Sequence, residues 1–289
     1  MASPAALRSL VHRKERLYFL LLLVTSMIVY ALGIGMLVAG ASMAPNVVGG
    51  MAAYIIGIPL VFFIIHGLGI GYLRGNGVRV TARQFPELLA MAQRHASTLG
   101  LARVPDLFVQ QSGGVLNAFA TRFLGRDFVV VYSDILAMAE QRGEAAVSFI
   151  VAHELAHVQR GHLKYHWLLL PGRIVPFLSA AYSRACEYTC DRFGAYCAPE
   201  GAVDGLLVLA AGKDLYHRVE ERDFAGQVET DGGFWVRWAE LLSTHPRLPK
   251  RVAALLAAGV RPSRDADMPT ALRASAPRAF EGMAAPIAG

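Results

Sequence analysis

The chain has 289 residues, of which 54% are hydrophobic and only 17% are charged. An ordinary soluble domain carries roughly 25% charged residues, so this composition excludes a disordered chain and argues against a purely soluble one. The net charge of +6 at pH 7 is small and dispersed, and it does not predict nucleic-acid binding. The three cysteines, Cys186, Cys190 and Cys197, form no disulfide framework, which is typical of a reducing compartment.

The first predicted elements are two membrane-spanning helices. Residues 17–40 contain no charge, and at about 1.5 Å per residue they cross a hydrocarbon core of roughly 30 Å. Basic residues precede this run, as in a signal peptide, but the run exceeds the roughly 7 to 15 apolar residues of a signal-peptide core. A second uncharged run, over residues 47–73, is also long enough to span. Together the runs predict a transmembrane helical hairpin.

The distribution of basic residues predicts the orientation of this hairpin. Residues 41–46 between the spans contain no Lys or Arg, whereas basic residues precede the first span and follow the second. By the positive-inside bias, residues 1–16 form a basic cytoplasmic N-terminus and the chain after residue 74 also faces the cytoplasm. The unpaired cysteines agree with that side.

The remaining chain is predicted to combine helices with a small sheet. Apolar residues recur at helical spacing over residues 85–97. Short strands are expected over residues 106–111, 117–123 and 128–133, and a three-stranded antiparallel sheet is their simplest assembly.

Two further helices and a tail follow this sheet. Ser133 or Asp134 begins a short helix that Gly143 breaks, and a longer helix is expected over residues 144–160. Residues 263–289 are rich in Ala and Pro, without periodicity, and predict a disordered tail.

The longer helix carries the sequence His153-Glu154-Leu155-Ala156-His157, an H-E-x-x-H motif. Four residues advance about 400° around a helix, so both imidazoles lie on one face and can bind one metal ion. Glu154 is offset by about 100° and can take a proton from a metal-bound water instead of ligating. A chance match would leave exposed histidines, but the apolar residues 145–152 before the motif predict partial burial. The motif therefore predicts a metal site.

A catalytic zinc site requires a third protein ligand. The extended motif H-E-x-x-H-x-x-G-x-x-H is absent, because Arg160 and Leu163 stand where that motif has its Gly and its third His. His162 and His166 are expected to be exposed or interfacial rather than ligands.

Acidic residues further along the chain are better candidates. Glu187 and Asp191 stand four residues apart on an expected helix, so one carboxylate could ligate the ion while the other orients a ligand imidazole. Cys186 and Cys190 have the same spacing and are alternative ligands, although buried apolar thiols are the favoured interpretation.

Four motifs resemble those of the HtpX and CAAX-prenyl-endopeptidase group of membrane zinc metallopeptidases. They are H-E-L-A-H at 153–157, R-x-x-E-Y-x-x-D at 184–191, N-A-F-A at 117–120, and T-H-P at 244–246 followed by Arg251. The resemblance covers roughly residues 74–258. It implies an α+β, mainly helical zincin-type metallopeptidase domain over residues 74–262, after the two-helix hairpin, in a membrane protein of the bacterial inner membrane.

The resemblance also implies roles for individual residues. Glu187 becomes the third zinc ligand, a gluzincin arrangement with one Zn²⁺ per chain, and Asp191 lies in the outer shell. His245 would stand near the oxyanion of the tetrahedral intermediate. The substrate cleft would follow Asn117, Ala118, Phe119 and Ala120, where a substrate backbone could add to an edge strand.

The segment between the second and third zinc ligands departs from the resemblance. Proteins of this group are similar in having membrane segments there, but only 29 residues separate His157 from Glu187. Two spans of about 20 residues cannot fit, and one span would put the ligands on opposite sides. Residues 166–182 must therefore stay on one side, either as an interfacial or re-entrant segment or as a buried soluble connection.

The expected function is hydrolysis of peptide bonds in protein or peptide substrates, by a metal-activated water with Glu154 as general base. The resemblance suggests quality control of membrane proteins. One alternative is a catalytically silent, zinc-stabilised membrane scaffold or regulator, which would have no use for Glu154. A third possibility is prenyl-protein processing, but two membrane spans would form little of a chamber for a lipidated C-terminus. Co²⁺ or Mn²⁺ could replace Zn²⁺ at this ligand set.

Overall fold

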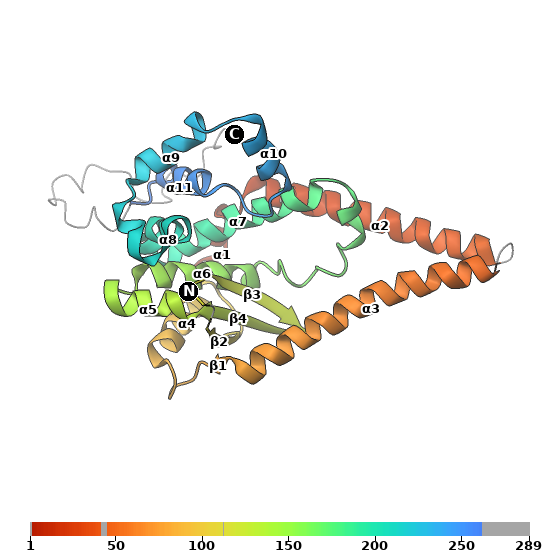
Figure 1. The fold of residues 1–289 in the computed structure, drawn as a ribbon, viewed down its shortest axis with the longest axis horizontal. Helices are drawn as coiled ribbons and strands as arrows, with labels where there is room; N and C mark the ends of the chain where they lie inside the picture. The colour runs from red at the N-terminus through yellow and green to blue at the C-terminus, as the bar shows by residue number, and fades with distance from the viewer. Residues whose placement is uncertain (1, 42–44, 112, 262–289) are drawn as a thin grey trace.

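The two uncharged runs form long helices, α2 (Arg13–Ala41) and α3 (Pro45–Asn76), in a computed structural model that describes residues 2–41, 45–111 and 113–261. They converge where the chain turns between them and diverge toward the rest of the molecule (Figure 1). Both helices are long and apolar enough to cross a membrane. Their apolar side chains are largely exposed, as at Val38 (71%) and Leu68 (68%), whereas a core helix of a soluble protein would bury them. The predicted tail over 263–289 lies outside the described residues.

Most other elements are helices that surround a small sheet. The strands are β1 (Val78–Arg79), β2 (Asp106–Gln110), β3 (Ala118–Phe123) and β4 (Arg126–Tyr132). The helices are α1 (Pro4–Ser9), α4 (Pro86–Thr98), α5 (Ser133–Arg142), α6 (Ala145–Gln159), α7 (Leu178–Cys197), α8 (Ala202–Leu215), α9 (Glu221–Thr230), α10 (Phe234–Leu242) and α11 (Leu248–Ala257). Short 3-10 turns are η1 (Pro171–Ile174), η2 (Pro199–Gly201) and η3 (Tyr216–Arg218). Three helices predicted after the hairpin therefore occur where they were expected.

The sheet is mixed, so the expectation of a wholly antiparallel sheet is wrong. Its strand order is β1-β2-β4-β3, with β2 and β4 parallel and the other two pairs antiparallel. The hairpin of β3 and β4 turns at Gly125, which has a φ of 79°. Strand β4 lies between β3 and β2, antiparallel to β3 and parallel to β2. Val129, Val130 and Val131 are fully buried, as expected of a central strand covered on both faces.

Helix α6 is the centre of the domain and is buried along most of its length. It packs against α7, α8, α4 and strand β3. Two glycines allow the neighbouring helices to approach Phe149 of α6: a Cβ on Gly194 of α7 would lie 2.8 Å from its ring, and one on Gly205 of α8 would lie 2.5 Å away. The close packing fixes the direction in which α6 presents its polar residues.

The first membrane helix is also joined to this domain. Glu15 at the start of α2 is 4% exposed, and its carboxylate accepts hydrogen bonds from Arg160 at 2.7 Å and from the Thr189 hydroxyl. His162 Nε2 lies 3.3 Å from the same carboxylate. Helix α2 therefore belongs to the domain as well as to the hairpin.

Candidate active site

Helix α6 places His153, Glu154 and His157 at the wall of a cleft of about 310 Å³. The side chains of His153 and Glu154 are 7% and 9% exposed, so both are surrounded mainly by protein atoms and not by solvent. The two histidine rings lie one helical turn apart, with ring centroids separated by 5.1 Å.

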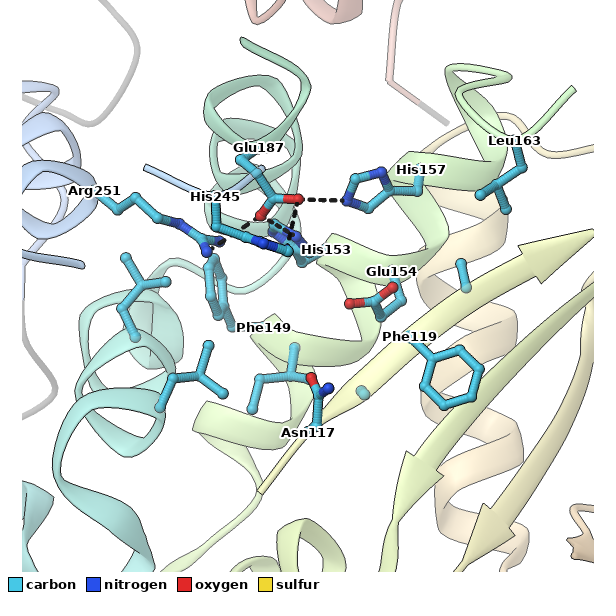
Figure 2. A pocket seen from close by; sticks show the side chains of 15 residues that line it. Asn117, Phe119, Phe149, His153, Glu154, His157, Leu163, Glu187, His245 and Arg251 are labelled. Carbon is cyan, nitrogen blue, oxygen red and sulfur yellow. Dashed lines mark ion pairs between the residues drawn. The ribbon is translucent and has the colours of Figure 1, made fainter. Parts of the chain in front are cut away.

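Glu187 of α7 faces both histidines (Figure 2). Its Oε2 lies 3.4 Å from His153 Nε2, and its Oε1 lies 3.4 Å from His157 Nε2. The three ligand atoms all lie within 4.8 Å of one another. Ligand atoms bound to a tetrahedral ion at about 2.0–2.1 Å stand about 3.4 Å apart, so the donor set fits a zinc ion.

Asp191 and Arg251 form a layer behind these ligands. Asp191 Oδ1 lies 3.0 Å from His153 Nδ1, which leaves Nε2 of that ring facing Glu187. Arg251 of α11 donates two hydrogen bonds to Asp191, at 2.8 and 2.6 Å, and lies 3.2 Å from Glu187. A bidentate Arg of this kind fixes the plane of the carboxylate and hence of the imidazole.

The electrostatics of the site favour a bound cation. Burial alone would lower the pKa of His153, but the carboxylates of Asp191 and Glu187 outweigh burial and raise this pKa to about 10. Burial would raise the pKa of Glu187, but Arg251 and the two histidines hold it well below its usual value. The site therefore keeps its carboxylates charged while it attracts positive charge.

Glu154 has a different environment from the other acidic residues. Burial raises the pKa of its carboxyl group, and the positive histidines and the backbone of Ala120 only partly oppose this effect. A carboxyl group with a raised pKa accepts a proton more readily near neutral pH, as a general base requires.

His245 reaches the site from the loop after α10. Its Nε2 lies 3.5 Å from Glu187 Oε1, although the side chain is 63% exposed. Arg184 of α7 donates hydrogen bonds to the backbone carbonyls of Glu240, Leu241 and Ser243, which anchors the loop next to the ligands. His245 is thus held near the site at the mouth of the cleft.

Strand β3 forms the opposite wall of the cleft. Asn117, Ala118, Phe119 and Ala120 all line it together with the α6 residues. Because β3 is at the edge of the sheet, one side of its backbone is free of strand partners in the described chain. An extended peptide could pair with such an edge.

His162 was expected to be exposed or interfacial, and this expectation is wrong. Its side chain is only 6% exposed, and its Nδ1 lies 3.1 Å from His157 Nδ1. It therefore links the buried Glu15 to a candidate ligand. His166, by contrast, is exposed and pairs with Arg173.

Both cysteines considered as alternative ligands are buried. Cys190 Sγ lies 3.7 Å from His162 Nδ1, and these two residues with His157 form a second group that could hold a metal. Burial raises the pKa of the Cys190 thiol well above its usual value, which disfavours the thiolate that a metal needs.

The sequence interpretation assigned no role to Arg251 or Glu15. Both are buried charged residues, at 4% exposure each. A signal existed for Arg251, since it lies on the same helix face as Val252 and Leu255, and an Arg on an apolar face needs a buried partner.

Comparisons with known proteins find one matching family and several similar proteins. The model of a family described as Peptidase family M48 matches residues 82–176 and 168–258. A protein named Protease HtpX homolog from Bacillus subtilis (strain 168) is 27% identical over 210 residues, covering 58% of this chain and 68% of that protein. A protein of the same name from Bacillus pumilus (strain SAFR-032) is 27% identical over 211 residues, with 58% and 69% covered. No solved structure matches this chain.

Proposed function

This chain belongs to peptidase family M48, and we propose that it is a membrane-anchored zinc endopeptidase. Membership of this family makes it a metalloprotease, a hydrolase that acts on peptide bonds. The observation that carries the zinc assignment is the convergence of His153, His157 and Glu187 at distances suited to one tetrahedral ion.

His153, His157 and Glu187 would hold the zinc ion, and Asp191 would orient the ring of His153. A bound zinc ion would supply a Lewis acid that lowers the pKa of a water molecule and polarises the scissile carbonyl.

Glu154 takes the proton from the attacking water and delivers it to the leaving amine. Its raised pKa and its position beside the ligands support this role. His245, at the mouth of the cleft, would donate a hydrogen bond to the oxyanion. The substrate backbone would pair with β3 at Asn117–Ala120, so recognition would depend little on substrate side chains.

The test compares four variants of the purified protein with the parent protein. Glu154→Gln should retain zinc but lose hydrolysis of a model protein substrate by several orders of magnitude, because the ligands remain while the base is gone. Glu187→Ala should strongly reduce zinc occupancy, and Asp191→Ala should weaken zinc binding about 10- to 100-fold. His166→Ala is the matched control and should leave both quantities unchanged. Near-normal hydrolysis by Glu154→Gln would reject Glu154 as the general base, whereas no hydrolysis by the zinc-loaded parent protein would favour the scaffold.

Two apolar helices and the similarity to HtpX proteases support a membrane protein. We further propose that it lies in a bacterial inner membrane with its catalytic domain in the cytoplasm, where it acts on membrane or misfolded proteins. The basic residues that flank the hairpin support this orientation. A reporter fused after Gly289 should report a cytoplasmic C-terminus, and a signal from the other side of the membrane would reject the orientation.

A further inference from the structure

An exposed ridge of apolar side chains lies next to the membrane helices. Helix α10 exposes Phe234, Trp235 and Trp238, and the segment before α7 exposes Ile174 and Phe177; Trp235 is 76% and Ile174 is 73% exposed. The two parts are continuous, since the ring of Phe177 lies 5.7 Å from Trp238, which stacks on Phe234 at 6.3 Å. We call these five residues the aromatic ridge. An exposed apolar patch of this kind marks an interaction surface.

The depth of the aromatic ridge follows from the packing of α7 against α2. The ring of His12 stacks on Tyr188 at 5.4 Å, and Phe19 lies 6.0 Å from Tyr182. The two helices are therefore antiparallel. Residues nearer the start of α7 contact residues further along α2, in its apolar part. Tyr182 thus lies near the start of the uncharged run of α2, and Phe177, which immediately precedes α7, lies between the levels of Phe19 and Ser26.

The segment that carries Ile174 continues along α2. Ser26 Oγ accepts a hydrogen bond from the Gly172 amide at 2.9 Å, and the Tyr30 hydroxyl donates to the Trp167 carbonyl at 3.1 Å. Irregular backbone is tolerated at hydrocarbon depth only where protein satisfies its polar groups. Helix α2 provides two such partners within its uncharged run.

We propose that the aromatic ridge inserts into the boundary between headgroups and acyl chains of the leaflet nearest the catalytic domain. Tryptophan prefers this boundary, because its ring is apolar and its N–H remains near water. Arg237 is exposed next to the ridge and would face lipid phosphates. Lipid is favoured over a protein partner because the turn η1 and helix α7, which flank Ile174 and Phe177 of the ridge, both pack against α2 of the hairpin. The proposal rests on the hairpin spanning a bilayer.

The test uses the three tryptophans of the chain, all of which lie in α10 or the segment along α2. The full-length protein is placed in bilayer nanodiscs with two of the three tryptophans replaced by Phe. With Trp235 alone, the emission should be shifted to the blue, lose most of its intensity to lipids brominated near the headgroup, and be protected from iodide. With Trp167 alone, lipids brominated deeper in the acyl chain should quench most strongly. Quenching of Trp235 by iodide, with no effect of brominated lipid, would overturn the proposal.

Two reporters in a tryptophan-free background separate the ridge from the hairpin. Leu215→Trp, at the exposed end of α8 away from the hairpin, should be quenched by iodide alone. Phe62→Trp, exposed on α3, should be quenched by brominated lipid. If Phe62→Trp is quenched while Trp235 is not, the hairpin spans the bilayer but the ridge proposal is wrong. Protection of Trp235 from both quenchers would also overturn it, since a second copy of the chain would then cover the ridge.

Discussion

Arg251 binds the carboxylates of Asp191 and Glu187, which the proposed zinc site needs in their charged state. It pairs with Asp191 and Glu187 while it is itself 4% exposed, and the positive charge lowers the pKa of both acids despite their burial. Each of these charges would be costly alone in the interior, so each depends on the others. This mutual dependence explains why an apolar helix face of α11 carries an arginine.

Zinc binding should release protons, because the pKa of His153 is raised to about 10 in the metal-free protein. A ligand must be deprotonated, so affinity should fall as the pH falls and more protons compete for the ring. Asp191→Asn removes one carboxylate that raises this pKa and should reduce the number of protons released. Calorimetric titration of zinc into metal-free protein, in buffers of different ionisation enthalpy, measures that number. Equal proton release by both proteins would contradict this account.

His95 should make the fold sensitive to acid. Burial lowers its pKa from 6.5 to about 4, and its Nε2 lies 2.8 Å from the Ser148 hydroxyl. The unfolded chain binds this proton at a higher pH than the folded chain does, so stability is lost as the pH falls from 6.5 toward 4. The loss is about 2 kcal/mol at pH 5. His95→Gln keeps a polar partner for Ser148 without titrating, and its melting temperature should change less between pH 7 and pH 5.

Elements whose pattern lies within one short stretch of the sequence could be predicted. Contacts between residues far apart in the chain could not. His153 and His157 lie on one helix, so their spacing alone brings them together. Asp191 and Arg251 are 60 residues apart and meet only when α11 docks on α7. The same reason explains the sheet: alternation of apolar residues finds strands, but it does not say that β4 lies between β2 and β3.

Replacement of glycine by alanine is expected to change the stability of the fold in opposite directions at two helical positions, Gly205 of α8, which packs against α6, and Gly226 of α9. Gly205→Ala should destabilise the fold by about 1–3 kcal/mol, because the added Cβ would lie 2.5 Å from the Phe149 ring. Gly226→Ala in α9 is the matched control: nothing lies within 4 Å of its Cβ, so the better helix propensity of Ala should stabilise by up to about 1 kcal/mol. Thermal unfolding of both variants measures the difference. If Gly205→Ala is no less stable than the parent protein, α6 does not need this close approach.

At the scale of the whole molecule, the hairpin and the catalytic domain share residues instead of meeting at a linker. Leu10 and Leu22, from α2 or just before it, are 1% exposed, and Leu10 packs in the main core. At the far side, His66 of α3 hydrogen-bonds the carbonyl of Arg122 at the end of β3. The uncharged runs predicted the hairpin, but no pattern in the sequence indicated these contacts.

Glu15 tests whether the domain depends on the first membrane helix. Glu15→Gln keeps the shape of the side chain but removes the charge that pairs with Arg160 and faces the buried His162. Breaking a buried ion pair on one side should lower the free energy of unfolding of the catalytic domain by about 3 kcal/mol. Arg16→Gln changes the neighbouring, exposed residue of the same helix and should stay within about 0.5 kcal/mol of the parent protein. Both variants are compared in the same bilayer or detergent, by thermal unfolding with and without chelator. If the two variants unfold alike, helix α2 is only an anchor. If Glu15→Gln alone lowers the stability, and lowers it more in the zinc-loaded protein, then α2 also supports the ligand His157 through His162.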